Sequence, residues 1–202
     1  GSKGSLSDLS ESHEIEQKIE SGCSLARYNV ASCQSVGKER SHNEDTLFTI
    51  NANLAGMESP ASLGLFLVAD GMGGHQSGEI ASSLAAQGVS QYLLKHILNE
   101  FFYDGKVFSD SELLKIIKSS VEEAQKLIRQ RVPGGGTTLT SVLVLGDRCF
   151  FVHVGDSRLY LLDQENRLTL KTKDHTLVKR LVDLGEITEK EADTHLQRNV
   201  LY

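Results

Sequence analysis

Two short acidic clusters contain the residues best suited to chemistry in this sequence. The first is Asn43-Glu44-Asp45, which follows the basic stretch Lys38-Glu39-Arg40, and the second is Val68-Ala69-Asp70-Gly71-Met72-Gly73-Gly74-His75. Carboxylates are the hard oxygen ligands that magnesium and manganese prefer. The planar guanidinium of Arg40 could bond two phosphate oxygens at once. The pattern therefore indicates a metal centre that handles phosphate.

Acidic residues at the ends of expected strands qualify as metal ligands, namely Glu44, Asp45, Asp70 and Asp156. Such ligands must be few and rigidly held, so that waters complete the coordination octahedron. Gly71 lets the backbone turn sharply after Asp70, so its carbonyl oxygen could approach an ion. Taken singly, each Asp-Gly or Gly-Asp pair is at least as well explained as a surface turn.

The elements that must position these residues follow an α+β order. Runs of apolar and β-branched residues predict strands at residues 45–50 and 64–69, with a loop at 51–62 between them, and at residues 137–145, 148–154 and 158–162. The short connections between the last three strands imply antiparallel hairpins. Apolar residues at a spacing near 3.6 predict a helix over residues 77–98. A second begins at the capping box of Ser109 with Glu112 and ends before Pro133. Helices are also expected after Asp174 and at the capping box of residues 188–191.

The composition is typical of one ordinary domain. The chain has 202 residues, 39% of them hydrophobic, which is enough for a substantial core. A formal charge of −6 argues against nucleic acid as a partner. No apolar run approaches the roughly 20 residues that cross a bilayer, and no cleavable leader is visible, so we expect a cytoplasmic protein with no membrane partner. Cys23, Cys33 and Cys149 lack zinc-ligand spacing and are expected to be reduced thiols.

Residues 1–24 are expected to form a flexible tail that includes an expression scar, and residues 25–202 the folded domain. The chain opens with Gly-Ser-Lys-Gly-Ser, and the following residues are rich in Ser and Glu. Ile15 and Ile19 lie four apart, so a short amphipathic helix is the alternative for this segment.

Five motifs occur in an order found in a known family. They are residues 40–45, residues 68–75, Gly78-Glu79, Gly135-Gly136-Thr137-Thr138 and Val154-Gly155-Asp156-Ser157-Arg158. From about Leu25 to Tyr202 the sequence resembles metal-dependent protein serine/threonine phosphatases of the PP2C type, in particular a bacterial member. The resemblance implies a β-sandwich of two antiparallel sheets flanked by pairs of α-helices. It also implies two, and up to three, Mn²⁺ or Mg²⁺ ions at one edge of the sandwich.

The resemblance further implies a role for each site residue. Asp70 would bridge two ions, Asp45 and the Gly71 carbonyl would bind one ion each or its waters, and Glu44 would hold a metal-bound water. Asp156 would belong to a third, weaker ion. Arg40 would hold the phosphate. The segment from about residue 172 to 197 would correspond to a variable flap beside the active site, which is thought to influence the choice of substrate.

The histidines and Arg158 have less certain roles. Human-type members of the family place a histidine directly after Asp-Gly, where this sequence has Met72. His75 could protonate the leaving oxygen, or it could hydrogen-bond its loop to the next helix. His42, near the first cluster, is a weaker catalytic candidate. His153 lies on an apolar strand and is expected to be a hydrogen-bonded structural residue, while Arg158 is expected to pair with a carboxylate and stiffen its turn.

The resemblance implies that relatives continue past Tyr202 with two more aspartates. The domain is therefore expected to be incomplete at its C-terminal end, either because the chain was cut or because the natural protein is short. The expected function is hydrolysis of phosphoserine and phosphothreonine in proteins by water activated between two metal ions. Expected partners are phosphorylated proteins and a serine/threonine kinase or its substrates. The alternative is a catalytically weak module that binds a phosphoprotein or regulates a kinase. We expect a monomer, unless the open sheet edge pairs with a second copy.

Overall fold

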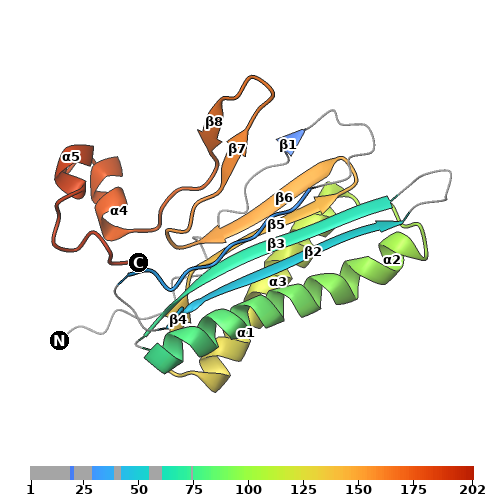
Figure 1. Cartoon of the computed structure of the whole chain (residues 1–202), viewed down its shortest axis with the longest axis horizontal. Coiled ribbons are helices and arrows are strands. Elements are labelled where there is room, and N and C mark those ends of the chain that lie inside the picture. Colours follow the sequence, from blue (N-terminus) through green and yellow to red (C-terminus); the bar gives the residue numbers. More distant parts are fainter. Residues whose placement is uncertain (1–18, 21–28, 39–41, 55–60, 74) are drawn as a thin grey trace.

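The computed structural model describes residues 19–20, 29–38, 42–54, 61–73 and 75–202, and Figure 1 shows how its elements are arranged. The strands are β1 (Ile19–Glu20), β2 (Asp45–Leu54), β3 (Ala61–Met72), β4 (Gly136–Thr137), β5 (Leu139–Leu145), β6 (Arg148–Val154), β7 (Tyr160–Leu162) and β8 (Leu168–Leu170). The helices are α1 (His75–Leu93), the π-helical stretch η2 (Leu94–Leu98), α2 (Asn99–Phe102), α3 (Asp110–Arg131), α4 (Leu177–Asp183) and α5 (Glu189–Ala192).

The main sheet is six-stranded and antiparallel. Its order is β1-β6-β5-β3-β2, and β4 pairs with the end of β3. The long helices α1 and α3 lie along one face of this sheet, and β7 and β8 form a separate two-stranded sheet beyond its edge (Figure 1). The predicted α+β class, with antiparallel sheets and paired helices, is confirmed. A sandwich implies two sheets. The described residues form the six-stranded sheet and, separate from it, the two-stranded β7–β8 sheet.

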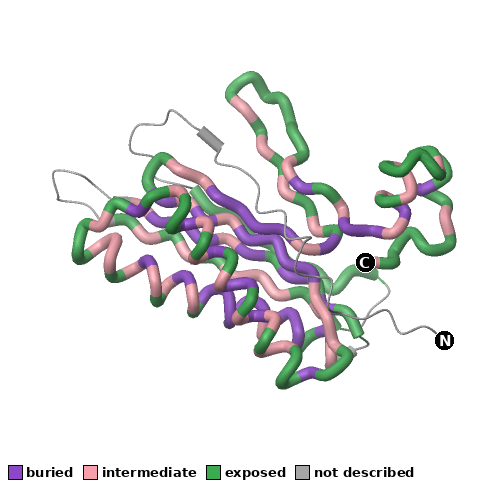
Figure 2. The backbone as a smooth tube through the Cα atoms, turned by 180° about the vertical axis from the view of Figure 1, so that it is seen from behind, coloured by how far each residue is buried: buried purple, intermediate pink, exposed green. Residues whose placement is uncertain are grey.

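The core lies between the sheet and the helices. Every second residue of β3 faces the helices, and Leu63, Leu65 and Leu67 are at most 1% exposed. They pack with apolar residues that recur at helical spacing, including Val89 of α1 and Leu113 of α3. In Figure 2 the buried residues follow the strands of this sheet and the sides of the helices that face it. Alternation in the strands and a period near 3.6 in the helices thus meet in one core.

The helix starts follow their predicted caps. Ser109 Oγ accepts a hydrogen bond from the backbone N–H of Glu112, whose carboxylate accepts one from the backbone N–H of Ser109, at 3.2 and 2.8 Å. The hydrogen bonds that the Glu112 carboxylate accepts from the backbone N–H and from the hydroxyl of Ser109 hold the pKa of this carboxyl below its ordinary value. The same reciprocal box starts α5 at Thr188 and Glu191. Among the helices in the described ranges, none combines the length and the apolarity needed to cross a membrane.

The hairpin predicted between residues 148–154 and 158–162 is wrong. The chain leaves β6 at Gly155, whose φ of 107° is in the region that favours glycine, and β7 then pairs with β8. Nothing in the sequence analysis anticipated β8, because its three residues are all exposed and too few to form a pattern. The turn after β6 therefore directs the chain away from the main sheet.

Two further differences concern segments expected to lack regular structure. The ladder between β2 and β3 continues as far as Leu54 opposite Ala61, so both strands extend into the expected loop. Within the expected tail, Ile19–Glu20 form β1 and pair with β6. The other residues of 1–24 lie outside the described ranges, so the boundary at residue 24 stays a prediction.

The contact between α1 and α3 is close enough to be tested at Gly88. A Cβ added there would lie 2.8 Å from the Ala124 Cα. Although alanine is the better helix former, we expect Gly88→Ala to lower the free energy of unfolding by about 1–3 kcal/mol, because the helices must move apart. Urea unfolding measures the change. Gln87→Ala, on the exposed side of the same helix, should change it by less than about 0.5 kcal/mol. Equal effects would contradict the close contact.

Candidate metal centre

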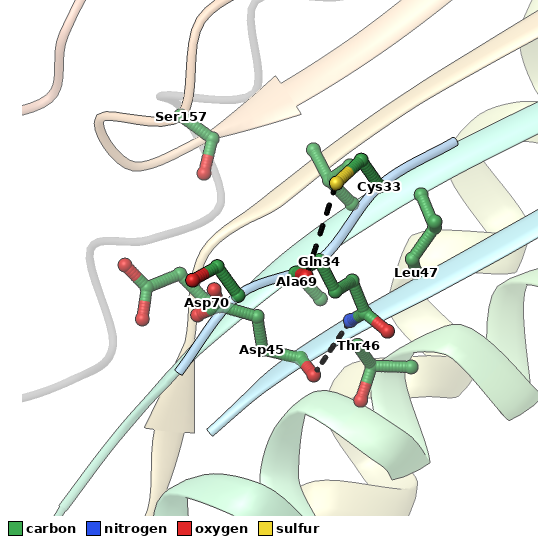
Figure 3. A pocket seen from close by; sticks show the side chains of 10 residues that line it. Cys33, Gln34, Asp45, Thr46, Leu47, Ala69, Asp70 and Ser157 are labelled. Carbon is green, nitrogen blue, oxygen red and sulfur yellow. Dashed lines mark hydrogen bonds between the residues drawn. The ribbon is translucent and has the colours of Figure 1, made fainter. Parts of the chain in front are cut away.

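The strand register places two of the predicted ligands opposite each other. Asp45, the first residue of β2, is the direct partner of Asp70, near the end of β3. Residues opposite each other in an antiparallel pair have Cβ atoms about 4.5–5.5 Å apart and project from the same face. Both aspartates are exposed, and Figure 3 shows them side by side. Like charges directly opposite destabilise a strand pair, so a shared cation would stabilise this one.

A cavity of about 250 Å³ adjoins the two carboxylates. It lies on the sheet face away from the helices, where residues 33–35 lie over the strands (Figure 3). Its polar lining comes from Asp45, Asp70, Ser35, Gln34 and Ser157, and its apolar lining includes Leu47 and Val68. The Gln34 side-chain amide donates to the Asp45 carbonyl oxygen at 3.2 Å. The carboxylate pair thus opens onto a space that water or a small ligand can enter.

The Gly-Gly-Thr-Thr motif fixes the backbone of Asp70. Thr138 Oγ1 accepts the Asp70 N–H at 3.0 Å, and the Thr138 N–H donates to the Asp70 carbonyl oxygen at 2.9 Å. Thr137 Oγ1 donates to the same carbonyl oxygen at 2.9 Å. Thr138 is 1% exposed, so its own hydroxyl bond to Asp70 is partly shielded from water, whereas the Thr137 bond is exposed. The motif therefore gives the second acidic cluster the rigidity that a metal ligand requires.

The backbone of the first acidic cluster is attached to β3 and α1. The Glu44 carbonyl oxygen accepts hydrogen bonds from the Gly71 N–H at 3.3 Å and from Ser82 Oγ at 2.7 Å. A Cβ on Gly71 would lie 2.1 Å from the Gly78 carbonyl oxygen, and one on Gly78 would lie 2.9 Å from Glu44 Oε2. Glycine at both positions lets the two acidic clusters and the start of α1 approach one another closely.

The structure describes the other predicted site residues less completely. Asp156 is exposed in the turn after β6, next to Ser157, which lines the cavity. The part of the chain that the structure describes does not gather three or more His, Cys, Asp or Glu side chains into one group able to hold an ion. Arg40 lies outside the described residues. His75 begins α1, and its side chain is likewise outside what the structure describes. The predicted role of each residue stays a prediction.

The donor set fits a divalent cation of the magnesium or manganese type. Such ions are commonly bound through one or two carboxylates, with waters in the remaining positions. Asp45 and Asp70 supply two carboxylates on adjacent rigid strands and face an open cavity. The site therefore has both the oxygen ligands and the space for water that this chemistry needs.

Arg158 and His153 have the structural contacts expected of them. The Arg158 guanidinium donates to both carboxylate oxygens of Asp174, at 3.0 Å from Nε and 2.6 Å from Nη2, and these bonds raise the pKa of Arg158 above its ordinary value. His153 is 2% exposed and has a partner at each ring nitrogen, Thr140 Oγ1 at 2.9 Å and the Lys173 carbonyl oxygen at 3.1 Å. Both therefore support the site from outside it.

Sequence reasoning missed three contributors to this site. Thr138 stands in a motif that also matches the family, and this signal could have indicated a structural role. Its partner Asp70 is remote in sequence, so the contact itself could not have been predicted. Ser82 belongs to no motif, and only its hydrogen bond to the Glu44 carbonyl oxygen reveals its role. Residues 33–35 carry no sequence signal, because a segment without regular secondary structure has no periodic pattern.

Comparison with known proteins decides the family. The model of the family described as Protein phosphatase 2C matches residues 38–200. The chain belongs to this family. It is 36% identical over 165 residues to the serine/threonine protein phosphatase PstP of Mycobacterium tuberculosis, which covers 82% of this chain and 28% of PstP. The predicted family and PP2C-type fold are confirmed.

Solved structures of relatives show the same fold. The serine/threonine phosphatase of S. agalactiae is 33% identical, with a TM-score of 0.65 over 82% of this chain and 64% of that one. The catalytic domain of PstP in complex with two manganese ions is 36% identical, with a TM-score of 0.55 over 77% of this chain and 60% of that one. This PP2C-type chain thus spans less than two thirds of the length of each of these relatives.

The contacts of His153 predict how folding stability depends on pH. Burial lowers the pKa of His153 below its ordinary value, so the unfolded chain binds a proton more readily than the folded one. Stability from the neutral ring is therefore present above the unfolded pKa of about 6.5 and is lost as the pH falls below it. We expect the free energy of unfolding to fall between about pH 7.5 and about pH 5.5, by at most about 1.4 kcal/mol per pH unit for this proton.

Urea unfolding at several pH values measures this dependence, and substitution separates the contribution of His153 from the rest. His153→Gln should reduce the slope, whereas His42→Gln, at an exposed position, should leave it unchanged. A slope that is the same in wild type and His153→Gln would show that the buried ring does not govern it.

Proposed function

We propose that this protein hydrolyses phosphoserine and phosphothreonine in proteins, using divalent metal ions. The observation that carries the proposal is the pairing of Asp45 with Asp70 across β2 and β3, beside an open cavity. Membership of the PP2C family supports it, as do relatives named serine/threonine protein phosphatases and one solved with two manganese ions. Phosphorylated proteins, and a serine/threonine kinase or its substrates, are the partners that this activity implies.

The proposed ions are Mn²⁺ or Mg²⁺, two of them held through Asp45 and Asp70 and a third near Asp156. When bound, such ions would polarise water and neutralise the charge that develops on the phosphoryl oxygens. The Gly71 carbonyl and Glu44 would complete the ligand set, directly or through water. Thr137 and Thr138 already bond the Asp70 backbone, so its carboxylate needs little reorganisation to act.

Two residues are proposed to act on the substrate. Arg40 would hold the phosphoryl group, since a planar guanidinium can bond two of its oxygens at once. His75, at the start of α1, would donate the proton that the leaving serine or threonine oxygen needs. Both lie next to the acidic clusters in sequence, which supports assigning them to the same reaction.

A second function is favoured by one observation. The described residues do not bring three or more potential metal-binding side chains into one group. A catalytically weak module would need fewer ligands, because it would bind a phosphoprotein or regulate a kinase without turnover. The two candidates differ in whether phosphate is released, so one assay separates them.

Replacing one carboxylate tests the proposed activity. We expect Asp70→Asn to reduce Mn²⁺-dependent hydrolysis of para-nitrophenyl phosphate and of a phosphothreonine peptide by about 100-fold or more, because a ligand charge is lost with little change in shape. Phosphate release measures the rate. Asp147→Asn makes the same chemical change in the exposed turn between β5 and β6 and should leave the rate unchanged.

The contrary outcomes are distinct. Hydrolysis that does not require Mn²⁺ or Mg²⁺, or that continues at the wild-type rate in Asp70→Asn, would contradict the proposed mechanism. Tight binding of the phosphothreonine peptide without any phosphate release would favour the second function instead.

A further inference from the structure

The turn that carries Asp156 is bonded at its outer side to the flap, which we define as residues 172–197. The His175 N–H donates to the Gly155 carbonyl oxygen at 2.8 Å, and His175 Nδ1 accepts the Gly155 N–H at 3.2 Å. Three residues further on, Arg158 forms its two-pronged pair with Asp174. The residues on either side of Asp156 and Ser157 are therefore both attached to the flap.

The same turn is bonded at its inner side to the metal-ligand strand. Ser157 Oγ and Thr138 Oγ1 form a hydrogen bond of 2.8 Å. Thr138 Oγ1 also accepts the Asp70 N–H at 3.0 Å. Gly155 packs directly on Thr138, because a Cβ added at Gly155 would lie 2.6 Å from Thr138 Cγ2. The buried Thr138 hydroxyl is thus a junction between the turn and Asp70.

These contacts form one short path from the flap to Asp70, through Asp174 and Arg158, then Ser157 and Thr138. The turn can move little by itself, because residues 155, 157 and 158 are each bonded either to the flap or to Thr138. A displacement of Asp174 or His175 must therefore move Ser157 or break one of the bonds. Coupling of this kind travels through contiguous hydrogen bonds and rigid strands, and it requires a demonstrated response at the far end.

We propose that Thr138 and Ser157 are positioning residues that couple the flap to Asp70, so that contacts made by the flap change the affinity of the carboxylate pair for divalent metal. This deepens the proposed function and depends on it for the metal. A phosphoprotein that binds the flap would then tighten or loosen metal binding. By linkage, metal would change the affinity for that phosphoprotein by the same factor.

The first test needs no metal. Hydrogen exchange of this chain is compared with that of Asp174→Ala, which removes the ion pair at the flap. We expect faster exchange at residues 68–71 as well as at residues 172–176, because the Asp70 N–H is held by Thr138. Asp163→Ala is the matched control, since it removes an Asp–Arg pair of 2.8 Å in the β7–β8 turn. It should leave residues 68–71 unchanged.

The second test asks whether the Ser157–Thr138 bond carries the effect. In Ser157→Ala, exchange at residues 68–71 should already be fast, and adding Asp174→Ala should change it little further, because the path is already broken. Thr138→Val should act like Ser157→Ala, and Thr138→Ser, which keeps the hydroxyl, should restore protection. Failure of the serine variant to restore protection where valine removes it would assign the effect to packing and overturn the role of the bond.

Calorimetric titration with Mn²⁺ then measures the consequence at the metal site. We expect Asp174→Ala, Ser157→Ala and Thr138→Val each to weaken Mn²⁺ binding by about 10-fold, the lower end of what outer-shell partners contribute, and Thr138→Ser and Asp163→Ala to match wild type. Unchanged exchange at residues 68–71 in Asp174→Ala would overturn the coupling. No Mn²⁺ binding by wild type would instead contradict the proposed function, while the exchange result would still decide whether the flap is coupled to Asp70.

Discussion

The register of β2 against β3 is the constraint on which the candidate site depends. Side chains alternate between the two faces of a strand, so burial of Leu63, Leu65 and Leu67 against the helices sends Asp70 to the opposite face. The same ladder puts Asp45 on that face, directly opposite. A slip of β3 by one residue would turn Asp70 toward the helices and expose the leucines. The hydrophobic core thus sets the position of the charged pair, although it makes no contact with a ligand.

A pair of opposed carboxylates costs stability, and the surrounding structure offsets this cost through the backbone. Hydrogen bonds from Thr137 and Thr138 hold the Asp70 main chain, and Gly71 and Ser82 bond the Glu44 carbonyl oxygen. These bonds fix the backbone from which the acidic side chains start, and Asp45 and Asp70 line the cavity. The arrangement suits a cation site, because a bound cation would attract both carboxylates.

The sequence predicted the periodic parts of this structure and the acidic residues, for identifiable reasons. The apolar run of β3 and the apolar stripes of α1 and α3 are local patterns, and the Ser109–Glu112 box is a local signal, so all were found. The pairing of Asp45 with Asp70 depends on strand partners remote in sequence, and the motifs indicated it only through family resemblance. The path of residues 33–35 and the contact of Ser82 with Glu44 depend on tertiary packing alone, which no local pattern records.

The hairpin that the sequence mispredicted lies where local and tertiary preferences conflict. A short Gly-Asp-Ser connection between two apolar runs favours a hairpin. In the structure, however, this turn bonds Thr138 on one side and Asp174 and His175 on the other. The turn forms these bonds in place of the ladder that a β6–β7 pair would form, and β7 pairs with β8 instead. A connection that bonds two separate elements, rather than pairing two strands, is better suited to pass a displacement of one element on to the other than to close a sheet. The local rule therefore fails at the point where residues 172–197 and the strand that carries Asp70 are both bonded to one turn.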